Sequence, residues 1–404
     1  MIHISALKKV VKRFLPALFV VLVISGGVAV STIATDNSRE GLLRQYSLDI
    51  LKQCSGSEYR PSCYDTEIPK LMDSGVSMED AYYVTRYIQK EDTEYFYCHV
   101  LGHNLSAKET AKDPSKWKDV VARAPSGMCS NGGIHGAFQE RFRAESLPDA
   151  NLSELRSILS GVCDKREGWN PTSLEQATCT HALGHLAMYI TDAHVENSVD
   201  LCREVAIRYG GNDFTQICFD GVFMQIFQPL EPEDFGLIED IAPKTKEDAL
   251  VFCSQFEGKV YESCHSESWP LSLKEIKTPE GLVGFCGLMT NEGRNRCFNA
   301  LFYVVTTQFR FNEERMTHFC SEIPETQKGQ CFANTASRMI ETDWSMIDAS
   351  VRICKTAEEF AVGDICYNEL LLYSTYNFHK DSKEFVSLCR ALPGEWEKRC
   401  FNGQ

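Results

Sequence analysis

The chain has 404 residues, of which 43% are hydrophobic and 24% are charged, the ordinary composition of a globular protein. Its length suits one elongated domain or two compact ones. The formal net charge is −15, and no stripe of Lys and Arg with interleaved aromatic residues is present, so no nucleic acid partner is expected.

The N-terminus has the pattern of a segment that enters a membrane. Residues 1–13 form a basic tail, expected to be cytoplasmic, and residues 14–34 carry no charge. The uncharged segment is long enough to cross a hydrocarbon core of about 30 Å, and the basic residues before it predict that the rest of the chain is exported. We predict an uncleaved single-pass transmembrane anchor at 14–34. A signal segment cleaved after Ala34, which would release a secreted protein, is the alternative.

All 18 cysteines follow this segment. An even number of cysteines outside the cytoplasm predicts disulfide bonds. The triplets that begin at Asn104 and Asn151 would permit glycosylation in a suitable host. Both features agree with an extracytoplasmic domain attached to the membrane through one N-terminal segment.

The cysteines of the C-terminal part recur with a regular period. Four units each contain a first cysteine, a polar stretch and a second cysteine followed by Phe or Tyr, and both cysteines recur every 34 or 35 residues: Cys286/Cys297, Cys320/Cys331, Cys354/Cys366 and Cys389/Cys400. A period near 34 is typical of a two-helix repeat. The sequence therefore predicts an all-α fold, a disulfide-stapled αα-repeat solenoid behind the N-terminal anchor.

The same order of cysteines continues toward the N-terminus. Four more local pairs have it, namely Cys54/Cys63, Cys163/Cys179, Cys202/Cys218 and Cys253/Cys264. Cys98 and Cys129 remain. Either they form a bridge between adjacent units, or they are two thiols available for metal or redox chemistry.

These patterns divide the exported part into four regions. Residues 35–94 are expected to form an N-terminal capping repeat, and residues 95–230 the αα repeats that contain histidine. Residues 231–248 are an acidic, proline-containing insertion, and residues 249–404 form the C-terminal disulfide-linked αα repeats.

Five of the ten histidines fall into register in the N-terminal repeats. His99 and His103 follow Cys98, His181 and His185 follow Cys179 with the same His-x-x-Gly-His spacing, and His135 follows Cys129 at the offset of His185. Residues four apart share one face of a helix, and equivalent helices of a repeat line one wall. The five imidazoles are therefore predicted to bind a transition metal, zinc, copper or iron, in a mononuclear or dinuclear site.

Other side chains near these positions carry less information. Glu140 follows His135 by five residues and is the candidate general base. Met224 stands at the offset of His135 in the unit that follows the histidine repeats, after Cys218, where it is a core residue or a copper ligand. No glycine-rich phosphate loop or Gly-x-Ser-x-Gly motif is present, which disfavours nucleotide-dependent enzymes and α/β hydrolases.

Three functions compete at this point. The first is an extracytoplasmic metalloprotein, with or without catalysis. The second is a solenoid that binds a protein or peptide partner and whose histidines pack or sense pH. The third is thiol–disulfide exchange through Cys98 and Cys129, for which the usual Cys-x-x-Cys motif is missing.

Overall fold

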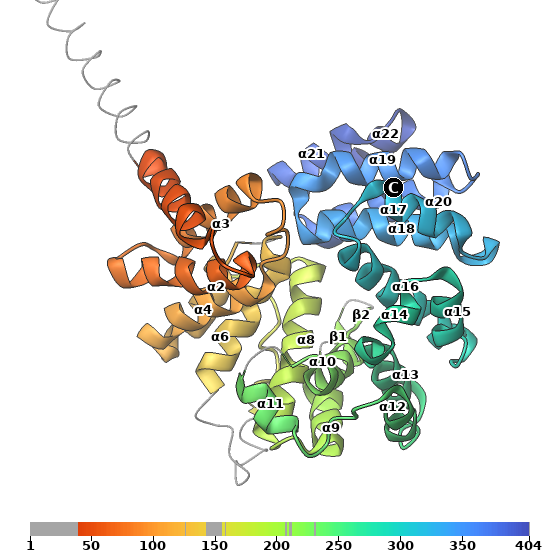
Figure 1. Cartoon of the computed structure of the whole chain (residues 1–404), viewed down its shortest axis with the longest axis horizontal. Coiled ribbons are helices and arrows are strands. Elements are labelled where there is room, and N and C mark those ends of the chain that lie inside the picture. The colour runs from red at the N-terminus through yellow and green to blue at the C-terminus, as the bar shows by residue number, and fades with distance from the viewer. Residues whose placement is uncertain are drawn as a thin grey trace, which may run out of the picture. The chain divides into compact units, whose positions relative to one another are not determined.

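A computed structural model describes residues 39–403 except 126, 143–155, 158, 207, 210–211 and 230–231. The described chain is helical apart from turns and one short antiparallel pair, β1 (Arg208–Tyr209) with β2 (Asn212–Asp213) (Figure 1). Within the described residues no helix is both long and apolar enough to span a membrane. The predicted anchor at 14–34 and the basic tail lie outside the described residues.

The chain divides into two compact units, Met1–Tyr95 and Phe96–Gln404. The described part of the first contains a helix at 39–54, α2 (Arg60–Lys70), the 3₁₀ turn η1 (Leu71–Ser74) and α3 (Met78–Glu91). The Ser77 side chain caps α3 by accepting a hydrogen bond from the Asp80 amide.

The second unit begins with the elements that carry the five histidines and their neighbours: α4 (His99–Lys112), η2 (Pro114–Lys116), α5 (Trp117–Arg123), η3 (Cys129–Asn131), α6 (Gly132–Phe142), α8 (Ser173–Ile190), α9 (Val195–Val205) and α10 (Thr215–Phe227). The capping box of Thr172 and Glu175 starts α8 by satisfying backbone donors at both residues.

The C-terminal half of the second unit is a succession of shorter and longer helices: α11 (Pro232–Ile238), α12 (Lys246–Cys253), α13 (Gly258–Glu267), η5 (Trp269–Ser272), α14 (Leu273–Ile276), α15 (Pro279–Cys286), α16 (Asn291–Gln308), α17 (Glu313–Glu322), α18 (Glu325–Thr342), η6 (Trp344–Met346), α19 (Ile347–Glu358), α20 (Gly363–Asn377), α21 (Lys383–Ala391) and α22 (Glu395–Asn402). Helices α16, α18, α20 and α22 pack successively on one another. Their apolar faces share one core, which includes Phe298, Phe302 and Phe332.

Every cysteine is in a disulfide. Eight bonds join the predicted local pairs, and the ninth joins Cys98 to Cys129, one of the two alternatives that the sequence left open: Cys54–Cys63, Cys98–Cys129, Cys163–Cys179, Cys202–Cys218, Cys253–Cys264, Cys286–Cys297, Cys320–Cys331, Cys354–Cys366 and Cys389–Cys400. The bridge between Cys98 and Cys129 removes the alternative of two available thiols. In the C-terminal repeats the second cysteine lies inside the long helix rather than at its start.

The second unit also brings its two ends together. Helix α20 contacts α8, and α18 contacts η3. The ring of Phe96, three residues before the start of α4, lies 5.7 Å from that of Phe311 between centroids. The C-terminal repeats therefore border the helices that carry the histidines.

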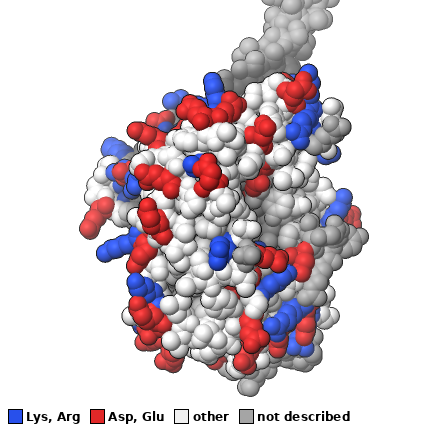
Figure 2. Space-filling view, turned by 90° about the vertical axis from the view of Figure 1, so that its right-hand side faces the viewer, with Lys and Arg blue, Asp and Glu red and all other residues white. Residues whose placement is uncertain are grey.

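The surface carries both signs of charge. On the face drawn in Figure 2, Lys and Arg side chains are interspersed with Asp and Glu. The excess of acidic residues in the sequence accounts for the net charge of −15.

Candidate metal centre

Glycines bring α4 and α6 into unusually close contact. A Cβ atom added at Gly136 would lie 2.0 Å from the carbonyl oxygen of His103, and one at Gly132 would lie 2.4 Å from that of His99. No real side chain tolerates such distances, so only glycine permits this approach. The close approach carries the imidazoles of α4 onto that of His135 in α6.

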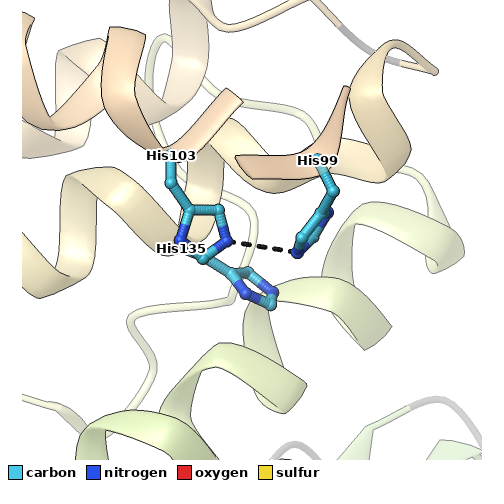
Figure 3. Close-up of side chains that lie close together, drawn as sticks. All are labelled: His99, His103 and His135. Atoms are coloured by element: carbon cyan, nitrogen blue, oxygen red, sulfur yellow. Dashed lines mark hydrogen bonds between the residues drawn. The ribbon is translucent and has the colours of Figure 1, made fainter. Parts of the chain in front are cut away.

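Three buried imidazoles converge between these helices, those of His99, His103 and His135 (Figure 3). Their nearest ring nitrogens all lie within 4.8 Å of one another. The Nε2 atoms of His99 and His103 are 3.1 Å apart, and the ring of His135 has its centroid 5.0 Å from each of the other two. Imidazoles that share one ion at about 2.0–2.1 Å have nitrogens roughly 3.3 Å apart in a tetrahedral arrangement. The His99–His103 pair therefore has the spacing of two ligands of one ion, and the triad could bind a metal.

The outer ring nitrogens of this group are held by the protein. His99 donates from Nδ1 to the carbonyl oxygen of Cys129 at 3.1 Å, and His103 hydrogen-bonds the side chain of Gln139. The proton that His99 holds on Nδ1 leaves the lone pair of its Nε2 facing the triad, which is the usual arrangement around metal-bound histidine. The buried Nε2 of His135 has no hydrogen-bond partner.

The backbone that leads into α6 is strained. Cys129, Ser130 and Asn131 have φ values of 51°, 47° and 55°, so three successive residues other than glycine adopt the left-handed conformation. Each such residue costs about 1–2 kcal/mol. The Cys98–Cys129 bond and the hydrogen bond from His99 hold this turn in place, and the turn sets the start of the helix that carries His135.

The second histidine pair lies beside the triad. On α8, His181 and His185 have their Nε2 atoms 3.2 Å apart. Their ring centroids lie 5.7 and 5.4 Å from that of His135. The structure thus gathers all five predicted histidines into one cluster, with His135 between the two pairs.

All five imidazoles are poor bases in this environment. Burial lowers the pKa of His99 to about 4 and lowers the pKa of the other four as well. The repulsion between neighbouring charged rings adds to this effect for His103 and His135. The rings are therefore neutral at pH 7, the form in which imidazole binds metals.

From the sequence, Met224 was expected to be either a core residue or a copper ligand. No sequence feature indicated the role of Gln225. The Met224 sulfur lies 3.3 Å from Nε2 of His181, and Nδ1 of His185 donates to the Gln225 side-chain oxygen at 2.7 Å. Both residues project from α10 toward α8. The offset that Met224 shares with His135 was the signal that could have placed it at the site.

Polar residues of the C-terminal repeats border the cluster. The Tyr97 ring stacks on His99 at 5.9 Å, and the Tyr97 side chain hydrogen-bonds Tyr303. Tyr303 has the offset in its repeat that His135 has in its own, and the Arg338 guanidinium lies 5.0 Å from the Tyr303 ring centroid. Tyr97 therefore links the histidine cluster to Tyr303 and Arg338 of the C-terminal repeats, a feature that sequence analysis missed because it depends on contact between distant repeats.

Glu140 lies on α6 and is half-buried. Five residues turn a helix by about 500°, so Glu140 lies about 140° around the helix from His135. The residues whose ligand atoms converge are histidines. The role of Glu140 as a general base stays a prediction.

Comparison of the chain with protein family models, with curated proteins and with solved structures finds no match. Its function is therefore inferred from its own residues.

Proposed function

We propose that this chain is an extracytoplasmic metal-binding protein, attached to the membrane by residues 14–34, which holds a transition metal in the histidine cluster. The observation that carries the proposal is the convergence of His99, His103 and His135, with the buried Nε2 of His135 left without a hydrogen-bond partner. A buried polar atom without a partner costs about 1–3 kcal/mol, and a bound ion would remove that cost.

The ligand atoms restrict which metals the site would bind. Three neutral imidazoles suit zinc, copper or iron, and a site with three protein ligands leaves a position for water or substrate. Such an open position would permit catalysis, with Glu140 as the candidate base. The tyrosines that border the cluster would then contact a ligand of the metal.

The nine disulfides support an oxidising compartment outside the cytoplasm, where such bonds persist. The succession of disulfide-linked helix pairs supports an αα-repeat solenoid, in which α16, α18, α20 and α22 form one row of successively packed helices. In this proposal the C-terminal repeats are the scaffold of the metal centre.

The second candidate is a solenoid that binds a protein or peptide partner and uses its histidines for packing. It is favoured by two large apolar side chains on α20 that are more than half exposed, Ile365 at 52% and Leu372 at 67%. A partner that binds there would still bind after the protein is treated with a chelator.

The test is elemental analysis of the full chain, made in an oxidising compartment without a His tag. We expect bound transition metal that is lost in the His135→Asn variant while circular dichroism is unchanged. His265 is the matched control, because it is also buried but donates from Nε2 to the Phe285 carbonyl oxygen away from the cluster. His265→Asn should retain the metal. A wild-type protein that takes up no metal after supplementation would overturn the proposal.

A further inference from the structure

The helix pair α8/α10 repeats the construction of α4/α6. A Cβ atom at Gly184 would lie 2.1 Å from the Cys218 carbonyl oxygen, and one at Gly221 would lie 2.1 Å from that of His181. The Gly221 contact matches that of Gly132 with the His99 carbonyl oxygen in the first pair, and Gly184 holds the position of Gly102 within the histidine helix. In both, a helix with histidines four residues apart is pressed against a second helix through glycine, and these are the two most extensively contacting helix pairs of the described chain.

The equivalence extends to one further side chain. His135 stands three residues after Gly132, and Met224 stands three residues after Gly221. The Met224 sulfur approaches His181 Nε2 to 3.3 Å, so it occupies in the second pair the place that the imidazole of His135 occupies in the first. Three atoms able to ligate a metal therefore meet between α8 and α10, two imidazole nitrogens and one thioether sulfur.

The hydrogen bonds of this second group leave its inner nitrogens without protons. His185 donates from Nδ1 to the side-chain oxygen of Gln225. His181 hydrogen-bonds the backbone of Ile217 in a contact that raises the histidine pKa, so the partner is the carbonyl oxygen, which can only accept. Each ring thus has its proton on the outer nitrogen. Two Nε2 lone pairs then face each other at 3.2 Å, an arrangement that a cation between them would stabilise.

We propose that the cluster holds two metal ions, one at His99, His103 and His135 and a second at His181, His185 and Met224, and that the second position is selective for copper. This inference rests on the proposed function, because it assumes that the first position binds metal.

Two positions explain the geometry better than one. Each helix supplies its own pair of Nε2 atoms, 3.1 Å apart on α4 and 3.2 Å apart on α8, so each pair can chelate an ion by itself. A single ion bound by five imidazoles would exceed the four ligands usual for zinc. Thioether sulfur is a soft ligand that favours Cu(I), whereas a set of imidazoles alone also suits zinc and iron.

The experiment titrates the metal-free full chain with Cu(I) under anaerobic conditions in the presence of a competing chelator, and separately with Zn²⁺. We expect two equivalents of Cu(I). Met224→Leu, which conserves side-chain volume, should weaken one Cu(I) equivalent by about tenfold or more, the scale already reached when an outer partner of a metal ligand is removed. X-ray absorption should show a copper–sulfur contribution in the wild type that Met224→Leu lacks.

The matched control is Met316→Leu, since Met316 is fully buried in the core away from the cluster. It should retain both Cu(I) equivalents. The double variant His181→Asn/His185→Asn should retain one equivalent, and so should the triple variant of the first set.

The outcomes separate this inference from the proposed function. No bound metal in the wild type overturns both. A different result is a wild type that binds one equivalent of metal, which requires His135 and which the His181→Asn/His185→Asn variant still binds. That result supports the proposed function and overturns the second metal position. Two equivalents of equal affinity in wild type and Met224→Leu, with no copper–sulfur contribution, overturn the copper selectivity.

Discussion

The Nδ1 atom of His99 donates to the carbonyl oxygen of Cys129 at 3.1 Å, and Cys129 is bonded through its sulfur to Cys98, the residue directly before His99. One covalent bond and one hydrogen bond therefore fix the same imidazole. The disulfide also holds the strained turn that begins α6, so it positions His135 on the opposite side of the triad.

We accordingly expect the double variant Cys98→Ala/Cys129→Ala to lose metal affinity as well as stability. Removing a bridge between residues separated by 31 positions should cost about 3–4 kcal/mol of unfolding free energy. Metal affinity should fall by about 10–100-fold, as it does when other outer supports of metal ligands are lost. Competition with a chelator measures the metal affinity under conditions in which the wild type and the double variant are both folded.

The comparison for this variant is Cys320→Ala/Cys331→Ala. That bond closes a separation of 11 residues in the C-terminal repeats and joins α17 to α18, neither of which carries a histidine of the cluster. Its loss should cost about 3 kcal/mol and leave metal affinity unchanged. Equal affinity in the two double variants would contradict a positioning role for the Cys98–Cys129 bond.

A second prediction concerns the contact between Gly136 and His103. In Gly136→Ala the new methyl group would lie 2.0 Å from a backbone oxygen, so α4 and α6 must separate. Overpacking of this kind costs about 1–3 kcal/mol, and the displaced rings should also bind metal more weakly. Thermal unfolding and metal titration measure the two effects.

Gly284→Ala is the control for this substitution. Gly284 lies in α15 with nothing within 4 Å of the added atom, and alanine is a better helix former than glycine by about 1 kcal/mol. The control should therefore be at least as stable as the wild type. A Gly136→Ala protein of equal stability and unchanged affinity would show that the helix contact is looser than these distances imply.

A third prediction concerns the first unit. Asp92 accepts hydrogen bonds from Arg60 at 2.7 and 3.1 Å and from the Tyr64 hydroxyl at 2.7 Å. The Arg60 contact, aided by Tyr64, lowers the pKa of Asp92 to about 2, below the usual value near 3.9. The folded state thus holds the proton less tightly than the unfolded state, so this stabilisation is present above about pH 4 and is lost as the pH falls toward 2.

We therefore expect Asp92→Asn to reduce the stability of α2 and α3 at pH 7 by about 1.5–3 kcal/mol, the scale of a hydrogen bond to a charged group. The difference from the wild type should disappear near pH 2. Hydrogen exchange of the α2 amides reports on this unit alone. A difference that does not change with pH would rule out the ionised carboxylate as its source.

The disulfides could be predicted from the sequence. The contacts around the histidines could be predicted from it only in part. The repeat period paired sixteen cysteines, and Cys98 and Cys129 were left as the remaining pair. The same register brought the five histidines together, because equivalent positions on successive helices lie side by side. The linkage of Gln225 to His185 depends on a glycine contact that spacing alone does not reveal.

The contact between the two ends of the second unit was also beyond sequence reasoning. A repeat period predicts that neighbouring units pack, but whether α20 returns to α8 depends on small rotations that accumulate over many units. The stacking of Tyr97 on His99 and its bond to Tyr303 follow from that return. Tyr97 also directly precedes a cysteine in the linker before α4, where no repeat pattern distinguishes it.

A fourth prediction is that the metal-free protein loses stability in mild acid. Burial lowers the pKa of all five clustered histidines, that of His99 to about 4, whereas an unfolded chain protonates histidine near pH 6.5. The unfolded state therefore binds more protons between these values. Stability is fully present above about pH 6.5 and falls as the pH decreases toward 4, with a slope of up to about 1.4 kcal/mol per pH unit for each histidine.

Urea unfolding of the chelated protein from pH 8 to pH 4 measures this slope. His135→Asn removes one buried base and should reduce the slope, whatever the substitution does to stability at pH 8. The metal-loaded wild type should show a steeper fall, because protons then also displace the ion. A chelated wild type whose unfolding free energy stays constant from pH 7 to pH 4 would mean that the folded state protonates these histidines as readily as the unfolded state does, which would contradict a buried cluster that keeps its imidazoles neutral.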